Sequence, residues 1–201
     1  MSYFKKFSRH DVTEKYGFNN HGVFADEPIM KGDIIWKCDV NTCDYLRSKK
    51  LKLGARREEV AAMMEKDPCL KDFIQRYIDM RDDDVYDIPS YEIKNSKSEY
   101  ICECAFFNHS CEPNVGFSMG SSNVLQALCN IKVNEELTID YQFIYTEATF
   151  LKVVNCKCGT QACRGSLLFD QYRNEDWQRK YYKYSCKFFI FFYQNFYNSN
   201  H

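Results

Sequence analysis

Two stretches decide the fold of this chain: Asn108–Asn114, with the sequence NHSCEPN, and Cys156–Cys163, with the sequence CKCGTQAC. The second stretch places three cysteines at C-x-C-x4-C spacing, and Cys111 of the first stretch can supply a fourth thiolate. Thiolates are soft ligands that suit a tetrahedral zinc site. We therefore predict one zinc ion that ties the middle of the chain to its C-terminal part, bound by Cys111, Cys156, Cys158 and Cys163.

The cysteines also fit interpretations other than a four-thiolate zinc site. Without zinc, three close thiols in a reducing compartment are inert or redox-active, as in a zinc-stabilised thiol sensor. Cys102 and Cys104 also suggest a metal pair, but alternate positions on a strand share one face, which favours buried hydrophobes. The 11 cysteines could form disulfides in a secreted protein, yet no charged segment followed by an apolar run opens the sequence. We expect an intracellular protein; nucleus and cytoplasm are not distinguished.

Composition and charge favour one compact domain. The 201 residues are 45% hydrophobic and 16% aromatic, which is too apolar for a disordered chain. The net charge of −1 gives no reason to expect direct nucleic-acid binding. The aromatic run Lys187–Tyr193 is too short to cross a bilayer, which needs about 20 apolar residues, so it either packs or forms an association surface. We predict no membrane contact, and the oligomeric state stays open.

Short apolar runs near the start of the chain predict strands. Val23–Ala25 and Ile34–Trp36 are rich in β-forming residues, and Met30–Asp33 supplies a turn between them. These features together predict a β-hairpin.

Two further strands are predicted in the second half of the chain, at Val124–Leu128 and Glu136–Tyr141. They flank a turn at Lys132–Glu135. Asn134 suits that turn because asparagine tolerates a left-handed backbone.

The pattern becomes helical between Arg56 and Met80. Asp67 followed by Pro68 is typical of a helix start, because the aspartate caps and proline fits the first helical position. One apolar stripe follows and predicts a buried face, formed by Leu70, Phe73, Ile74, Tyr77 and Ile78. The acidic run Arg81–Asp87 predicts a solvated loop, which would attract basic peptides if it lay beside a groove.

A third motif, Glu135–Tyr141 (EELTIDY), lies between the two cysteine stretches, and a fourth, Asn20–Ala25 (NHGVFA), precedes them. In this order the four motifs resemble the SET-domain protein lysine methyltransferases that carry a zinc-binding post-SET segment. The resemblance covers Tyr16–Phe169. It implies an α+β SET (β-clip) fold of small, mostly antiparallel sheets, a pseudoknot at Asn108–Asn114 and a C-terminal zinc lobe. The implied divisions are a SET domain at 16–145 with a helical insert at about 44–95, a post-SET segment at 152–170 and an extension at 171–201.

The resemblance also implies functional residues. S-adenosyl-L-methionine would be held by Asn20, His21, Gly22, Asn108, His109 and Leu168. The catalytic residue would be Tyr141, whose hydroxyl would orient a lysine amine and the methyl group at near-attack distance. Asp140 would secure the end of the strand. Three positions depart from the family pattern: Asn20 replaces a glycine, Ala105 an arginine, and Ile139 a phenylalanine or tyrosine associated with product multiplicity, so multiplicity cannot be inferred.

The implied function is S-adenosyl-L-methionine-dependent protein-lysine N-methylation, with zinc as a second bound group. The partner would be a protein or peptide that carries lysine, with a histone tail as the first candidate. The alternative from another class is a catalytically silent SET-like, zinc-stabilised module that binds a protein partner, which the three departures favour. Cofactor binding discriminates the two, because a silent module need not bind S-adenosyl-L-methionine.

Overall fold

The computed structural model describes residues 6–17, 20–38, 50–82, 84–89, 106–119, 121 and 123–186. The larger sheet has seven strands in the order β1-β2-β10-β8-β9-β3, with β7 also paired to β10. Its members are β1 (Phe7–Asp11), β2 (His21–Ala25), β3 (Ile34–Lys37), β7 (Asn108–His109), β8 (Val115–Phe117), β9 (Val124–Ala127) and β10 (Glu136–Ile139). Most pairs are antiparallel, but β7 and β8 both run parallel to β10. This mixed pairing brings three distant segments of the chain to one place.

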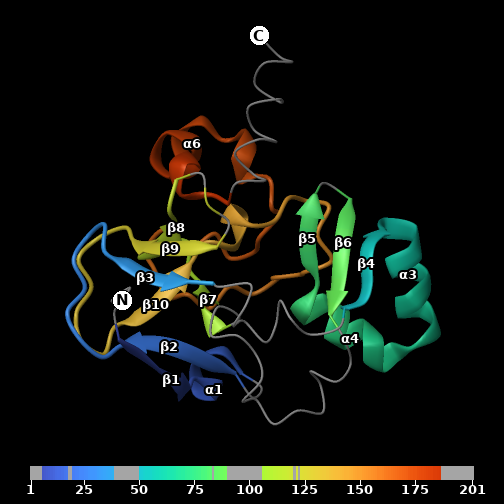
Figure 1. Cartoon of the computed structure of the whole chain (residues 1–201), viewed down its shortest axis with the longest axis horizontal. Helices are drawn as coiled ribbons and strands as arrows, with labels where there is room; N and C mark the ends of the chain where they lie inside the picture. The colour runs from blue at the N-terminus through green and yellow to red at the C-terminus, as the bar shows by residue number, and fades with distance from the viewer. Residues whose placement is uncertain are drawn as a thin grey trace.

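A second lobe contains a three-stranded sheet in the order β4-β6-β5 and two helices. Its elements are β4 (Lys50–Arg56), α3 (Arg57–Lys66), α4 (Pro68–Tyr77), β5 (Asp79–Asp82) and β6 (Val85–Pro89). Figure 1 shows this lobe beside the larger sheet, with the C-terminal helix α6 (Glu175–Tyr181) over β8 and β9. The remaining described elements are α1 (Thr13–Tyr16) and the 3-10 turns η3 (Tyr141–Phe143), η4 (Gln171–Arg173) and η5 (Tyr182–Tyr184).

The predicted helix start at Asp67 and Pro68 is confirmed. The Leu70 backbone N–H donates to Asp67 Oδ1 at 3.1 Å, and α4 begins at Pro68. Three side chains of the predicted stripe are buried, at Leu70, Ile74 and Ile78. The side chains of Phe73 and Tyr77 lie outside the described set. The apolar spacing therefore identified the buried face of α4 wherever the structure describes it.

The predicted hairpin between Val23–Ala25 and Ile34–Trp36 is wrong. Both segments are strands, but β2 pairs with β1 and β10, whereas β3 pairs with β9. Since β2 has a partner along each edge, no edge is left for β3. The intervening chain bridges to Ile131 at Ile29 and then makes its turn at Met30–Asp33, as predicted.

Two other boundaries also differ from the prediction. The acidic run, predicted as a loop, instead forms the end of β5 and the beginning of β6, and Asp84 between them has a left-handed φ of 58°. Strand β10 ends at Ile139 rather than Tyr141, because the Asp140 side chain accepts a hydrogen bond from the Gln142 backbone and starts η3. The predicted turn at Lys132–Glu135 is confirmed, with Asn134 at φ 63°.

The two lobes meet at the segment that follows Tyr141. Arg57 and Tyr86 of the second lobe both donate to the carbonyl oxygen of Ala148. The Arg57 guanidinium also lies 4.8 Å from the ring centre of Phe150, which contacts the Tyr86 ring at 5.0 Å. The second lobe therefore anchors the chain a few residues beyond the candidate catalytic tyrosine.

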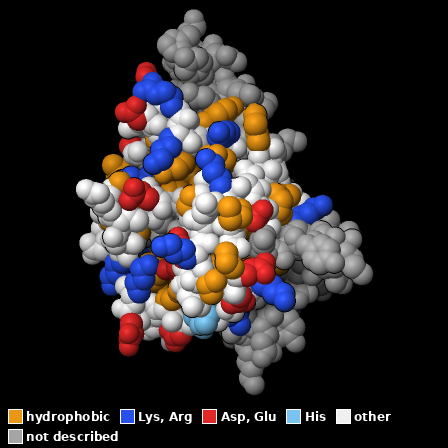
Figure 2. Space-filling view, turned by 90° about the vertical axis from the view of Figure 1, so that its left-hand side faces the viewer, with side chains coloured by type: hydrophobic (Ala, Val, Ile, Leu, Met, Phe, Trp, Pro, Cys, Tyr) orange, Lys and Arg blue, Asp and Glu red, His pale blue; other side chains and the backbone are white. Residues whose placement is uncertain are grey.

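The surface carries charges of both signs. Figure 2 shows lysine, arginine, aspartate and glutamate side chains interspersed over one face, in keeping with a net charge of −1. Among the described residues, no helix is both long and apolar enough to cross a membrane. Ala105, the pair Cys102 and Cys104, and the aromatic run 187–193 lie outside the described residues, so the predictions about them stay predictions.

Candidate functional site

The structure brings the four predicted zinc ligands together. The Sγ atoms all lie within 4.8 Å of one another, at Cys111, Cys156, Cys158 and Cys163. Cys111 Sγ is 3.9 Å from Cys156 Sγ, close to the separation of about 3.8 Å that Zn–S bonds of roughly 2.3 Å give in a tetrahedron. An antiparallel bridge between Val153 and Leu167 closes the loop that carries three of these cysteines. The donor set and its spacing thus fit zinc.

The thiols differ in how readily they lose a proton. Burial raises the pKa of the Cys111 and Cys156 thiols. At Cys158 burial acts in the same direction, but hydrogen bonding, mainly from the Thr160 hydroxyl at 3.3 Å, outweighs it and lowers the pKa to about 6. Zinc is bound by thiolates, so a cation held by all four sulfurs would have to displace the protons of Cys111 and Cys156 as well.

His109 connects the cysteine cluster to the candidate catalytic residue. The backbone N–H of Tyr141 donates to His109 Nδ1 at 3.2 Å, so this nitrogen is an acceptor. The proton of the neutral ring is therefore assigned to Nε2, which lies 3.3 Å from Cys111 Sγ. Burial lowers the pKa of His109 to about 4, with Asp140 opposing and Arg164 assisting that shift. The imidazole is thus a neutral bridge, and both of its nitrogens are engaged within the protein.

The other predicted cofactor residues on β2 and β7 also lie together. Asn108 Nδ2 donates to the carbonyl oxygen of His21 at 3.0 Å and to Glu136 Oε1 at 3.0 Å. A Cβ at Gly22 would lie 2.8 Å from the Glu136 carboxylate and 3.0 Å from Asn108 Nδ2, so only glycine fits there without displacement. Asn20 enters β2 with its carbonyl oxygen accepting from the Val12 backbone at 2.9 Å.

Leu168 differs from its two neighbours in solvent exposure. It is 69% exposed, whereas Leu167 and Phe169 are buried against Cys111 and the cysteine loop. Phe169 adopts a left-handed φ of 59°, and its ring contacts Tyr145 at 6.0 Å between centroids. The apolar wall beside Tyr141 is therefore made by Leu167 and Phe169, with Leu168 at its outer edge.

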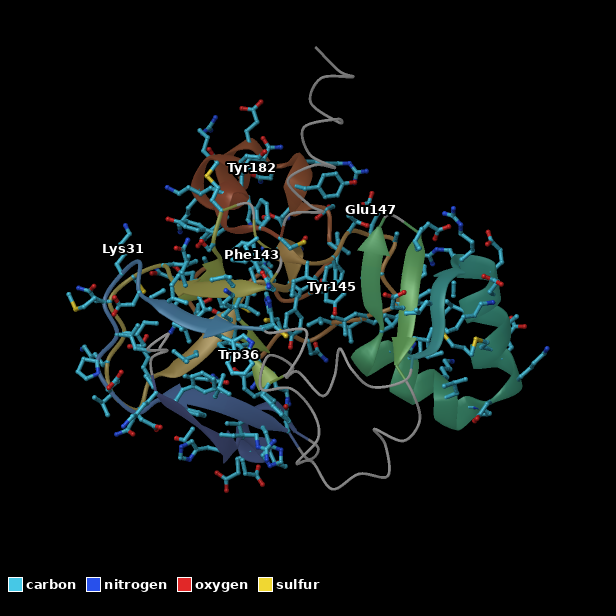
Figure 3. The ribbon with its side chains drawn as sticks, viewed as in Figure 1. Lys31, Trp36, Phe143, Tyr145, Glu147 and Tyr182 are labelled. Carbon is cyan, nitrogen blue, oxygen red and sulfur yellow. The ribbon has the colours of Figure 1, made fainter. Side chains whose placement is uncertain are left out.

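Tyr141 lies where these groups converge. Its ring packs on His109 at 5.3 Å and on Tyr145 at 6.4 Å, edge to face. Burial raises the pKa of its hydroxyl, assisted by Tyr16 and Glu136. The hydroxyl therefore stays protonated at neutral pH and can serve as a hydrogen-bonding group. Figure 3 shows Tyr145 between the larger sheet and the second lobe.

Sequence reasoning missed several residues of this region. Glu136 stands inside the EELTIDY motif, and Tyr16 Oη donates to it at 3.1 Å while Lys15 Nζ pairs with it at 2.7 Å. Arg164 directly follows the last predicted zinc ligand, and its guanidinium binds Asp140 at 2.8 Å. Both Glu136 and Arg164 could have been found, because each belongs to a quoted motif or adjoins one. Tyr16 carries no such signal.

Comparison with known proteins supports one family. Residues 20–142 match the SET domain. A "Histone-lysine N-methyltransferase, H3 lysine-4 specific" of Chaetomium globosum is 31% identical over 154 residues, which are 74% of this chain and 12% of that protein. The "Histone-lysine N-methyltransferase ash1" of Drosophila melanogaster is 41% identical over 68 residues, 31% of this chain and 3% of that protein. The chain thus spans only a small part of the relatives it matches.

A solved structure from Plasmodium falciparum also resembles the chain. Its TM-score is 0.35 at 20% sequence identity, over 68% of this chain and 93% of that one. The match over residues 20–142 takes in both the Asn108–Asn114 segment and Tyr141, which the geometry above brings together. The chain therefore belongs to the SET-domain family.

Proposed function

We propose that this chain is an S-adenosyl-L-methionine-dependent protein-lysine N-methyltransferase, with Tyr141 as its catalytic residue and zinc held by the four clustered cysteines. The observation that carries the proposal is the bridge through His109, which links the Tyr141 backbone at 3.2 Å to Cys111 at 3.3 Å. Through it, the cysteine cluster helps to fix the position of the residue that would orient the reaction.

The zinc would be structural. Four cysteine sulfurs fill all positions of a tetrahedral site, so none is left for a substrate or water. The expected division of the chain is retained as part of this proposal: a SET domain at 16–145, a post-SET zinc segment at 152–170 and an extension at 171–201. In this scheme Cys111 of the first part and the three cysteines of the second share one ion.

The cofactor would lie against β2 and β7. Bound there, S-adenosyl-L-methionine would supply a methyl group on a positively charged sulfur. Gly22 lets the chain approach closely, His21 and Asn20 offer backbone groups, and Asn108 is held in place by His21 and Glu136. The His109 side chain is occupied on both sides, so its contribution would come from its backbone. Leu168 would cover the site from the zinc lobe.

Tyr141 would position the lysine rather than remove its proton. A free lysine amine has a pKa near 10.4, so making it neutral at pH 7 costs about 4.6 kcal/mol. An apolar wall disfavours the ammonium form, and Leu167 and Phe169 supply such a wall. The Tyr141 hydroxyl, whose pKa burial raises, stays protonated and can align the amine at near-attack distance.

A histone tail is the substrate that we propose first. The support is the naming of several relatives as histone-lysine methyltransferases, three of them as specific for H3 lysine 4. The exposed carboxylate of Glu112, beside the cysteine cluster, suits a basic peptide. A ribosomal or other cellular protein would satisfy the same chemistry.

The test is a transfer assay with radiolabelled S-adenosyl-L-methionine and separate pools of histones and whole-cell lysate, followed by mass spectrometry of the labelled peptides. Label on lysine, lost in Tyr141→Phe, is expected. Binding of the cofactor without transfer to any pool would oppose the proposed activity. A chain that neither binds the cofactor nor labels itself would favour the alternative, a catalytically silent interaction module.

A further inference from the structure

Asp140 ties three separate parts of the chain together. Its carboxylate is fully buried. Oδ1 accepts from Arg164 Nη2 at 2.8 Å and from the backbone N–H of Gln142 at 3.0 Å, whereas Oδ2 accepts from Trp177 Nε1 at 3.1 Å. Arg164 belongs to the cysteine lobe, and Trp177 belongs to α6 in the C-terminal extension, beyond the matched SET residues.

We propose that Trp177 is a positioning residue of the methyl-transfer site, acting through Asp140, and that α6 is therefore part of the catalytic unit. This inference rests on the proposed function. Asp140 immediately precedes Tyr141, and its carboxylate accepts from the Gln142 backbone N–H on the other side of Tyr141, so a reoriented carboxylate would lose the hydrogen bond that fixes this turn. A buried carboxylate oxygen without a hydrogen-bond donor is energetically costly. Loss of one donor therefore favours rotation of the carboxylate toward the donors that remain.

The C-terminal segment holds the turn around Tyr141 at three further points. The backbone N–H of Gln171 donates to Gln142 Oε1 at 3.3 Å, and that of Cys186 donates to the Phe143 carbonyl at 3.0 Å. The ring of Trp177 packs on the Phe143 ring at 5.7 Å. Figure 3 shows Phe143 beneath the C-terminal elements that carry Tyr182. The extension thus contacts Gln142 and Phe143, the two residues of η3 that follow Tyr141.

The sequence provides for this attachment locally. Asn174 caps α6 by accepting from the backbone N–H groups of Asp176 and Trp177, which fixes the turn from which the indole projects. Trp177 is 7% exposed, and Tyr181 one turn later packs on Phe143 at 5.6 Å. The helix would remain packed through its rings even without the indole hydrogen bond, which allows the polar contact to be tested separately.

The experiment compares Trp177→Phe with Trp36→Phe in the full chain loaded with zinc. Both changes remove an indole N–H and keep a ring, but Trp36 Nε1 has no hydrogen-bond partner among the described residues. We expect Trp177→Phe to lower kcat about tenfold, as for other supporting contacts, with KM for the cofactor close to that of Trp36→Phe and a Tm lower only by the loss of one buried hydrogen bond. Equal kcat values for the two variants would overturn the inference.

A double-mutant cycle with Asp140→Ala, which removes the acceptor of the Trp177 indole, tests the route of the effect. If Trp177 acts through Asp140, Trp177→Phe causes no further loss of kcat in the Asp140→Ala background; reductions that multiply would contradict this. If Asp140→Ala does not fold, the comparison of the two tryptophan variants still decides.

Failure of the inference about Trp177 can be distinguished from failure of the proposed function. If the wild-type chain binds cofactor but transfers no methyl, the proposed function fails, and the amide resonance of Tyr141 becomes the readout. Displacement of that resonance by Trp177→Phe, but not by Trp36→Phe, supports the positioning role. An unmoved Tyr141 amide overturns it.

Discussion

His109 Nε2 lies 3.3 Å from Cys111 Sγ, so the ring of one motif residue donates to a sulfur of the cysteine cluster. The other ring nitrogen accepts from the Tyr141 backbone. Contacts that orient a metal ligand in this way tune metal affinity as well as geometry. The cluster and the candidate catalytic residue therefore share one buried imidazole.

Replacing that imidazole should affect both sites. His109→Leu removes both hydrogen bonds and leaves the buried Tyr141 N–H without its acceptor, a loss of about 1–3 kcal/mol in the free energy of unfolding. We expect zinc affinity to fall roughly 10- to 100-fold. Competition with a chromophoric chelator measures it. His10→Leu, at an exposed position of β1, is the control, and equal zinc affinity in the two variants would refute the bridge.

Zinc content tests the cysteine cluster. One zinc per chain is expected in the wild type, because four sulfurs within 4.8 Å match one tetrahedral ion. Cys158→Ser should lose it, whereas Cys129→Ser should keep it, since Cys129 is exposed and outside the cluster. Elemental analysis of the purified proteins measures both. Full zinc retention in Cys158→Ser would count against the assignment.

Removing zinc should weaken cofactor binding, although no cysteine need touch the cofactor. Cys111 follows Asn108 and His109 closely, and the other three cysteines anchor the segment at Leu168. We expect roughly tenfold weaker binding of S-adenosyl-L-methionine and loss of activity. Calorimetric titration of zinc-free protein, shown by circular dichroism to be folded, provides the measurement. Wild-type affinity for the cofactor in the zinc-free protein would mean that zinc stabilises the fold without affecting the cofactor site.

Gly22 should be required for cofactor binding rather than for folding alone. In Gly22→Ala the added methyl meets Asn108 Nδ2 at 3.0 Å and the Glu136 carboxylate at 2.8 Å, so the Asn108 amide must shift. Gly116→Ala is the matched control, since its methyl meets Tyr184 Cβ at 2.9 Å in the core. Both variants should lose stability, but only Gly22→Ala should bind S-adenosyl-L-methionine at least about tenfold more weakly. Equal affinities by calorimetry would argue against a cofactor site here.

Much of the fold could be predicted because its signals are local. The cap at Asp67 and the turn at Asn134 depend on a few neighbouring residues, and both were found where predicted. The pairing of β2 could not be predicted in the same way. Its partners are β1 and β10, and the second of these lies far along the chain, so hydrophobic runs and turns alone suggested β3 instead.

The candidate site shows the same difference between local signals, which could be predicted, and long-range contacts, which could not. The motif spacing identified the four cysteines and the neighbours of Tyr141, which the structure brings together. It gave no sign that both His109 nitrogens are occupied, or that Trp177 reaches Asp140. These contacts depend on the three-dimensional path of segments that no local pattern connects. The role of Leu168 as a cover for the cofactor also stays a prediction. Its side chain is exposed, whereas that of the adjacent Phe169 is buried.

The most direct test of the central claim is single-turnover methyl transfer by Tyr141→Phe, with Tyr184→Phe as the control for loss of a tyrosine hydroxyl. The proposed positioning role predicts a transfer rate reduced roughly 100-fold with cofactor affinity nearly unchanged, because the lost hydroxyl aligns the amine and does not hold the cofactor. Tyr184→Phe should react at the wild-type rate. Transfer by Tyr141→Phe at the rate of Tyr184→Phe would contradict the account.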